Sequence, residues 1–139
     1  MVTSPTDDID RIVRAFTRFS RRTRGEGREV QPGLTYVDFS LLRIVANEPG
    51  ILAGVVAGEA YIDKSTASRQ LTSLVERGLV RRADGSGRRM PLYLTDEGLA
   101  VLEIAEKAQR ETVAGRTEDW SDTERATFAE LLDRYNAAP

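Results

Sequence analysis

The sequence predicts a mainly α-helical protein with one small β-hairpin, and three observations predict this class. Apolar residues recur at helical spacing in successive segments along the 139 residues. Thr35-x-x-Asp38 and Ser121-x-x-Glu124 have the spacing of a capping box, a pattern that starts a helix. Asp84-Gly85 is a strong signal for a tight turn, and it lies between two short strand-like segments, Leu79–Arg82 and Arg89–Leu94.

The composition fits one compact domain and argues against catalysis. The chain has no Cys, which excludes disulfides, thiolate nucleophiles and Cys-based zinc sites, and no His, the usual general base and the commonest metal ligand. We therefore expect no enzyme activity, no cofactor and no metal. Arg43 and Glu48 interrupt the most apolar stretch, and Met1–Asp10 lacks the basic and apolar parts of a signal peptide. These features predict a cytoplasmic protein without a membrane segment.

The first part of the chain predicts three helices. One begins near Asp7, with Arg residues opposite an apolar face formed by Ile9, Ile12, Val13, Phe16 and Phe19. A loop is expected next, at Gly25, Gly27, Pro32 and Gly33. The second helix starts after Thr35 and is apolar on most sides, so we expect it to be central. The third covers residues 51–60, where packing must offset two glycines that each cost about 1 kcal/mol relative to Ala.

The fourth predicted helix has two different faces. Asp63 is expected to cap it, and Gly78 is suited to the left-handed conformation that ends it after Arg77. One face is apolar and consists of Ala67, Leu71, Leu74 and Val75. The opposite face is short, polar and nearly free of acidic residues, and it consists of Ser65, Ser68, Arg69 and Thr72. Such a face is unusual for a helix that only meets solvent.

Two further helices are predicted after the hairpin. Thr95 opens a fifth helix that continues toward Arg116, and Ser121 opens a sixth. The apolar faces of the first, fifth and sixth helices have too few partners within one chain of this length. We therefore expect a homodimer in which a shared helical bundle buries these faces.

The charges are segregated along the chain. The net charge is −2, but residues 63–94 carry seven basic and three acidic groups, and residues 95–139 carry five basic and eleven acidic groups. Of the 20 basic residues, 18 are Arg, a side chain that suits phosphate recognition. The basic centre indicates a local site for a polyanion on an otherwise acidic protein.

A helix, a tight turn, a polar-faced helix and a basic hairpin form the layout of a winged helix-turn-helix, so the expected partner is double-stranded DNA. The polar face would enter the major groove, Arg88 and Arg89 at the hairpin tip would approach the minor groove, and Arg81 and Arg82 would meet phosphates. The DNA-contacting residues predicted in this way are Lys64, Ser65, Ser68, Arg69, Thr72, Arg81, Arg82, Arg88 and Arg89.

Four stretches resemble the multiple-antibiotic-resistance regulator (MarR) family: Leu34–Leu42, Ile62–Arg69, Leu74–Arg82, and Arg88-Arg89 followed by Leu94–Gly98. The resemblance covers about Asp7 to Tyr135. It implies a homodimeric winged-helix transcription regulator, a repressor at a pseudo-palindromic operator, whose first and last helices form the dimer interface. The chain would then divide into an N-terminal dimerisation helix (1–34), a DNA-binding domain (35–94) and C-terminal dimerisation helices (95–139).

Carried over by position, the resemblance places recognition-helix contacts on Ser65, Thr66, Ser68 and Arg69, and the wing-tip arginine on Arg88. Two positions depart from the family pattern. Ser86 stands where the family usually has an Asp, two residues before the wing-tip arginine, with Asp84 nearby as a substitute. Tyr61 occupies the turn before the recognition helix, where the family commonly has Gly.

The resemblance also implies an aromatic or lipophilic effector, for which the lining candidates are Phe16, Tyr36, Phe39 and Arg43. The alternative for Phe16 and Phe39 is that they are core residues without a ligand. The alternative function is a non-DNA-binding helical interaction protein, an anti-repressor or antitoxin-like dimer on the same scaffold. A carboxylate-based enzyme is a third class, but the sequence shows no converging constellation for it.

Overall fold

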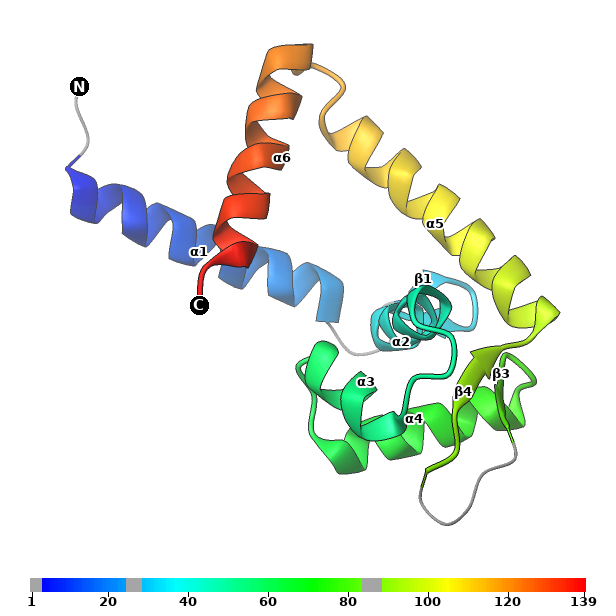
Figure 1. The fold of residues 1–139 in the computed structure, drawn as a ribbon. Helices are drawn as coiled ribbons and strands as arrows, with labels where there is room; N and C mark the ends of the chain where they lie inside the picture. Colours follow the sequence, from blue (N-terminus) through cyan, green and yellow to red (C-terminus); the bar gives the residue numbers. More distant parts are fainter. Residues whose placement is uncertain (1–3, 25–28, 84–88) are drawn as a thin grey trace. The chain divides into compact units, whose positions relative to one another are not determined.

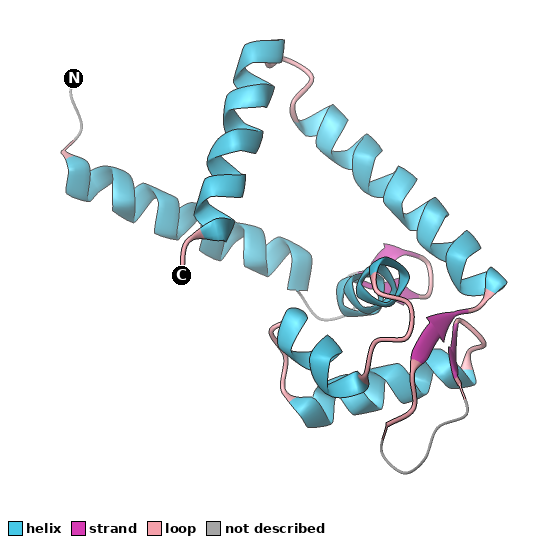
Figure 2. Cartoon of the chain, viewed as in Figure 1, coloured by secondary structure: helices cyan, strands magenta, loops and turns pink. Residues whose placement is uncertain are grey.

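The computed structural model describes residues 4–24, 29–83 and 89–139, and within them the helices and the wing follow the predicted order (Figures 1 and 2). The described residues form the helices α1 (Pro5–Arg24), α2 (Tyr36–Asn47), α3 (Ala53–Glu59), α4 (Lys64–Glu76), α5 (Asp96–Arg116) and α6 (Asp122–Ala137). Two small antiparallel sheets accompany them: β1 (Glu29–Gln31) with β2 (Leu34–Thr35), and β3 (Val80–Arg82) with β4 (Leu92–Leu94). The mainly α fold with a hairpin wing is confirmed.

The chain forms two compact units, residues 1–105 and 106–139, so that α5 begins in the first and ends in the second. Within the described segments, no helix is both long enough and apolar enough to cross a membrane.

Helix α2 is central to the core of the first unit, as predicted. Its side chains Leu41, Leu42 and Val45 are fully buried, and the helix contacts α3, α4 and β4. Burial of each such side chain contributes about 1.5–3 kcal/mol. Helix α4 supplies Leu71 and Leu74 to the same core, and the wing supplies Val80 and Leu92. The recognition-type helix and the base of the wing are therefore packed on one shared core.

The expected loop at Pro32 and Gly33 is the turn of a second hairpin, β1–β2, which the sequence did not predict. Glu29 pairs with Thr35 and Gln31 with Leu34, with an irregularity between the two pairs. Gly33 has φ 81°, and Pro followed by a left-handed Gly suits the central positions of a type II turn. Gly25 and Gly27, the other expected loop residues, lie outside the described residues.

Helix α3 is shorter than predicted, because the residues before it join the wing. The amide of Gly50 donates to the carbonyl of Leu92 (2.8 Å), and the amide of Leu92 donates to the carbonyl of Ile51 (3.0 Å). Ile51 therefore extends the β3–β4 sheet by one bridge. After α3, Tyr61 is 91% exposed and has φ 54°, which explains why a Gly would suit this turn.

Helix α5 starts directly against the turn that ends α4. Gly78 has φ 76°, and the hydroxyl of Thr95 donates to its carbonyl (2.6 Å) while accepting from the amide of Gly98 (3.0 Å). The backbone at Gly98 approaches Leu79 so closely that a Cβ atom would lie 2.0 Å from the Leu79 carbonyl oxygen. Only a residue without a side chain fits at this crossing.

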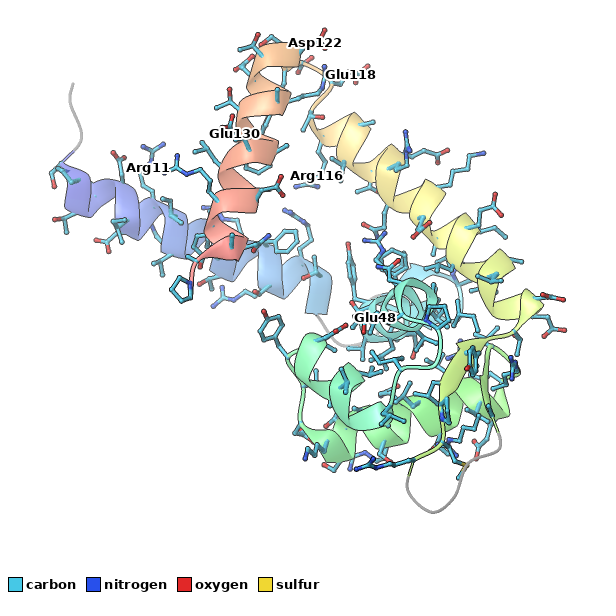
Figure 3. The ribbon with its side chains drawn as sticks, viewed as in Figure 1. Arg11, Glu48, Arg116, Glu118, Asp122 and Glu130 are labelled. Carbon is cyan, nitrogen blue, oxygen red and sulfur yellow. The ribbon has the colours of Figure 1, made fainter. Side chains whose placement is uncertain are left out.

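The second unit is held together at the turn between α5 and α6, near Glu118 and Asp122 (Figure 3). The guanidinium of Arg125 donates to the carbonyl oxygens of Thr117 (2.9 Å) and Glu118 (3.3 Å) and pairs with Asp122 (3.0 Å). The predicted capping box of α6 is confirmed, and hydrogen bonds from Ser121 lower the pKa of its Glu124 partner.

We predict that Gly98→Ala destabilises the protein by about 3 kcal/mol, because the added methyl group meets rigid backbone rather than a side chain that can turn away. Gly54→Ala is the matched control, since a Cβ at Gly54 meets nothing within 4 Å and Ala favours the helix by up to about 1 kcal/mol. Urea unfolding of both variants at one protein concentration tests this. Equal stability of the two variants would contradict the close approach at Leu79.

Candidate nucleic-acid interface

The N-terminus of α4 is organised by Asp63, the predicted cap. One carboxylate oxygen of Asp63 accepts from the amide of Thr66 (2.7 Å) and from the hydroxyl of Ser65 (2.6 Å), and the other accepts from the Thr66 hydroxyl (2.8 Å). These hydrogen bonds hold the pKa of Asp63 well below its usual range, and the bond from the Ser65 hydroxyl contributes most to this lowering. The carboxylate is therefore ionised at neutral pH, and it fixes both neighbouring hydroxyl groups.

The rest of α4 sorts into the two predicted faces. Ala67, Leu71 and Leu74 are buried in the core. On the other side, Lys64, Ser65, Ser68 and Arg69 are exposed, and Thr66 and Thr72 are half-buried. The guanidinium of Arg69 lies 3.4 Å from the Thr66 hydroxyl oxygen, to which it donates. The result is one solvent-facing surface of hydroxyl groups and cations, which we call the α4 face.

The base of the wing carries two arginines, Arg81 and Arg82, that the strand geometry sends to opposite sides, and only Arg82 continues the α4 face. The guanidinium of Arg82 donates to the Thr72 hydroxyl (3.0 Å), which ties β3 to α4. The guanidinium of Arg81 stacks at 4.4 Å from the centre of the Tyr93 ring, on the neighbouring strand. Arg82 is therefore held at the edge of the α4 face, whereas Arg81 is directed elsewhere on the wing.

Of the two arginines predicted at the tip of the wing, the structure describes Arg89. Arg89 is exposed and lies outside the strand that was expected to include it, since β4 begins at Leu92. Arg88, Asp84 and Ser86 lie outside the described residues, so the wing-tip contact remains a prediction.

A salt bridge that the sequence did not predict positions the other end of α4. Arg77, the C-cap residue of α4, pairs with Asp38 of α2 at 3.1 Å and donates to the carbonyl of Gly33. The Asp38 side chain is 5% exposed and also accepts from the Thr35 amide in the capping box of α2. The two residues are 39 positions apart, and only the capping role of Asp38 was visible in the sequence.

The proposed effector residues are partly brought together. Phe39 is buried in the core, and the guanidinium of Arg43, one turn later on α2, stacks at 4.6 Å from its ring centre. Tyr36, the first residue of α2, is half-buried, as is Phe16 on α1. Phe39 is therefore a core residue, as its alternative assignment expected, and its role in contacting an effector stays a prediction.

Several apolar side chains on the long helices stay exposed in the single chain. Each is between 47% and 61% exposed: Ile9, Ile12, Val13 and Phe19 on α1, Leu99, Ile104 and Val113 on α5, and Phe128, Leu131 and Tyr135 on α6. These are the faces for which the sequence predicts a second copy of the chain.

Comparison with known proteins identifies the class. The model of the MarR family matches residues 33–90. The chain is 32% identical to a putative transcriptional regulatory protein for the hcr operon of Thauera aromatica over 125 residues, 88% of this chain and 72% of that protein. It is 28% identical to the HTH-type transcriptional repressor Rv2887 of Mycobacterium tuberculosis over 107 residues, 76% of this chain and 77% of that protein.

The solved structure of a MarR family transcriptional regulator from Silicibacter pomeroyi is also similar. It matches with a TM-score of 0.67 and 28% identity, covering 91% of this chain and 85% of that one.

A polar-faced helix after a tight turn, followed by a two-stranded wing, defines a winged helix-turn-helix protein of the transcription-regulator class. The chain belongs to the MarR family, whose members are DNA-binding regulators rather than enzymes. The predicted family and class are confirmed, and they favour a DNA-binding regulator over the non-DNA-binding interaction protein.

We predict that Arg77→Ala lowers the free energy of unfolding by about 2 kcal/mol. Removing one partner of a buried pair costs about 3–5 kcal/mol, and Arg77 is itself partly exposed, which reduces the effect. The control is Arg11→Ala, because the Arg11–Asp8 pair is exposed at both ends and its loss should cost less than about 0.5 kcal/mol. Urea titration of both variants tests this, and a small, equal loss for both would show that the bridge contributes little.

Proposed function

We propose that the protein is a transcriptional repressor that binds a pseudo-palindromic duplex as a homodimer, with the α4 face in the major groove. The observation that carries this proposal is the α4 face itself, an exposed helix surface of hydroxyl groups and Arg69 that Arg82 of the wing extends. The major groove admits one helix, and short hydroxyl side chains and the two-pronged guanidinium of an Arg can hydrogen-bond to the base edges there.

The proposed contacts divide into two groups. Ser65, Thr66, Ser68 and Arg69 face base edges, while Lys64 and Arg82 meet phosphates on either side. Thr72 holds Arg82 through the 3.0 Å hydrogen bond, so the phosphate-binding guanidinium has a defined position before DNA arrives. Arg81, Arg88 and Arg89 complete the proposed wing contacts.

The exposed apolar residues of α1, α5 and α6 support the homodimer. These helices fall in the proposed dimerisation regions, residues 1–34 and 95–139, which flank a DNA-binding domain at residues 35–94. A dimer of this kind places two recognition helices about one DNA turn apart, ~34–36 Å, which matches a two-fold operator.

An aromatic-acid effector is the second part of the proposal, and one contact supports it. The guanidinium of Arg43 stacks on the buried Phe39 ring and would pair with the carboxylate of a planar acid, for which Tyr36 would supply the aromatic surface. Phe16 of α1 is the remaining lining candidate.

We predict that affinity for duplex DNA from upstream of the gene falls steeply with salt, because phosphate contacts release counterions. Arg82→Ala should reduce the slope of log K against log salt by about 1 and weaken all duplexes alike. Arg110→Ala, which removes the same charge from exposed α5, is the control and should leave the slope unchanged. Fluorescence anisotropy over a salt series measures both.

Salt-independent binding would overturn the phosphate-contact proposal. An unchanged slope for Arg82→Ala would show that this guanidinium does not meet the DNA backbone.

A further inference from the structure

Asp63 does more than cap α4, because a carboxylate can only accept hydrogen bonds. The hydroxyl of Ser65 lies 2.6 Å from one Asp63 oxygen and the hydroxyl of Thr66 lies 2.8 Å from the other. An ionised carboxylate has no proton to give, so each hydroxyl must donate its own proton to Asp63. Both hydroxyl protons are therefore committed within the protein.

A hydroxyl group whose proton is committed can only accept from a ligand. Its remaining lone pairs suit an N–H donor and disfavour another acceptor. The guanidinium of Arg69 already uses Thr66 in this way, donating to its hydroxyl oxygen at 3.4 Å. A directed chain thus runs from Arg69 through Thr66 to Asp63, with each donor and acceptor role fixed by the carboxylate.

We infer that Asp63 is a specificity-determining positioning residue, which makes Ser65 and Thr66 acceptors and so directs the start of α4 toward amino-bearing bases. In the major groove these bases are cytosine, with its N4 amine, and adenine, with its N6 amine. Guanine and thymine present oxo groups instead. These groups are acceptors too, so they cannot hydrogen-bond to the hydroxyl oxygens of Ser65 and Thr66. This inference rests on the proposed function, because it specifies what the α4 face reads.

The charge of Asp63 reinforces the same choice. The side chain is exposed at the end of α4, where its negative charge repels both phosphates and the oxo groups of bases. It therefore weakens binding to every duplex and weakens it least where an amine is available. The neighbouring donor, Arg69, prefers guanine. Arg69 and the hydroxyl groups oriented by Asp63 therefore favour different bases at different positions.

The test uses Asp63→Asn in the full chain, because Asn caps a helix about as well as Asp. The amide oxygen can still accept from the Thr66 backbone, but the amide NH2 is a donor, so at least one hydroxyl regains a free proton. Wild type and variant are each used to select duplexes from a pool with a random central region, and the retained sequences are read. Binding to an unselected random duplex is measured at the same salt concentration.

For the wild type we expect cytosine or adenine at a fixed position in each half-site. For Asp63→Asn we expect that preference to fall about tenfold, within the discrimination that one good base contact provides, while other positions are unchanged. Affinity for random duplex should stay equal or rise. Ser65→Ala, which keeps the cap, should weaken preference at the same position, and the thermal midpoints of both variants should match the wild type.

A variant Asp63→Asn that retains every base preference of the wild type would overturn the inference while leaving DNA binding intact. A uniform loss at all positions together with a lower thermal midpoint would do so too, because it would assign Asp63 to capping alone. A wild type that selects no sequence at all would overturn the proposed function, and this inference with it.

Discussion

The surface that would meet DNA depends on the fixing of both ends of α4 by carboxylates. At the N-terminus Asp63 accepts from the Thr66 amide and from two hydroxyl groups, and at the C-terminus Arg77 is held by buried Asp38 of α2. The apolar contacts that α4 makes in the core are not directional. The Arg77–Asp38 bridge therefore adds a directional link between α4 and α2, while the Asp63 cap orders the first turn of α4 itself.

The wing and the start of α5 contact the same helix or the turn that ends it. Thr72 holds Arg82 of the wing, and the turn that ends α4 receives the start of α5 through Thr95 and the close approach of Gly98. Wing, recognition helix and the first turn of α5 are therefore connected by directional contacts of a few ångströms. This arrangement lets a protein with a net charge of −2 present a local cationic surface.

The sequence predicted what periodicity and local capping encode: the helix order, both capping boxes, the Asp63 cap, the left-handed Gly78 and the polar face of α4. It did not predict the Arg77–Asp38 bridge, because no local pattern links residues 39 positions apart. The β1–β2 hairpin was missed because strands of two and three residues are too short to show alternation. Ile51, which forms an isolated β-bridge with Leu92, was predicted to be helical because a short apolar run fits both periods.

The placement of α4 in the major groove is tested most directly by dimethyl sulfate probing of a duplex selected by the protein. This reagent methylates guanine N7 in the major groove and adenine N3 in the minor groove, so one experiment reports on both grooves. We expect the bound protein to protect guanine N7 in two blocks about one helical turn apart, ~34–36 Å, one for each recognition helix of a dimer. A stable complex in which every guanine N7 stays reactive would contradict that placement.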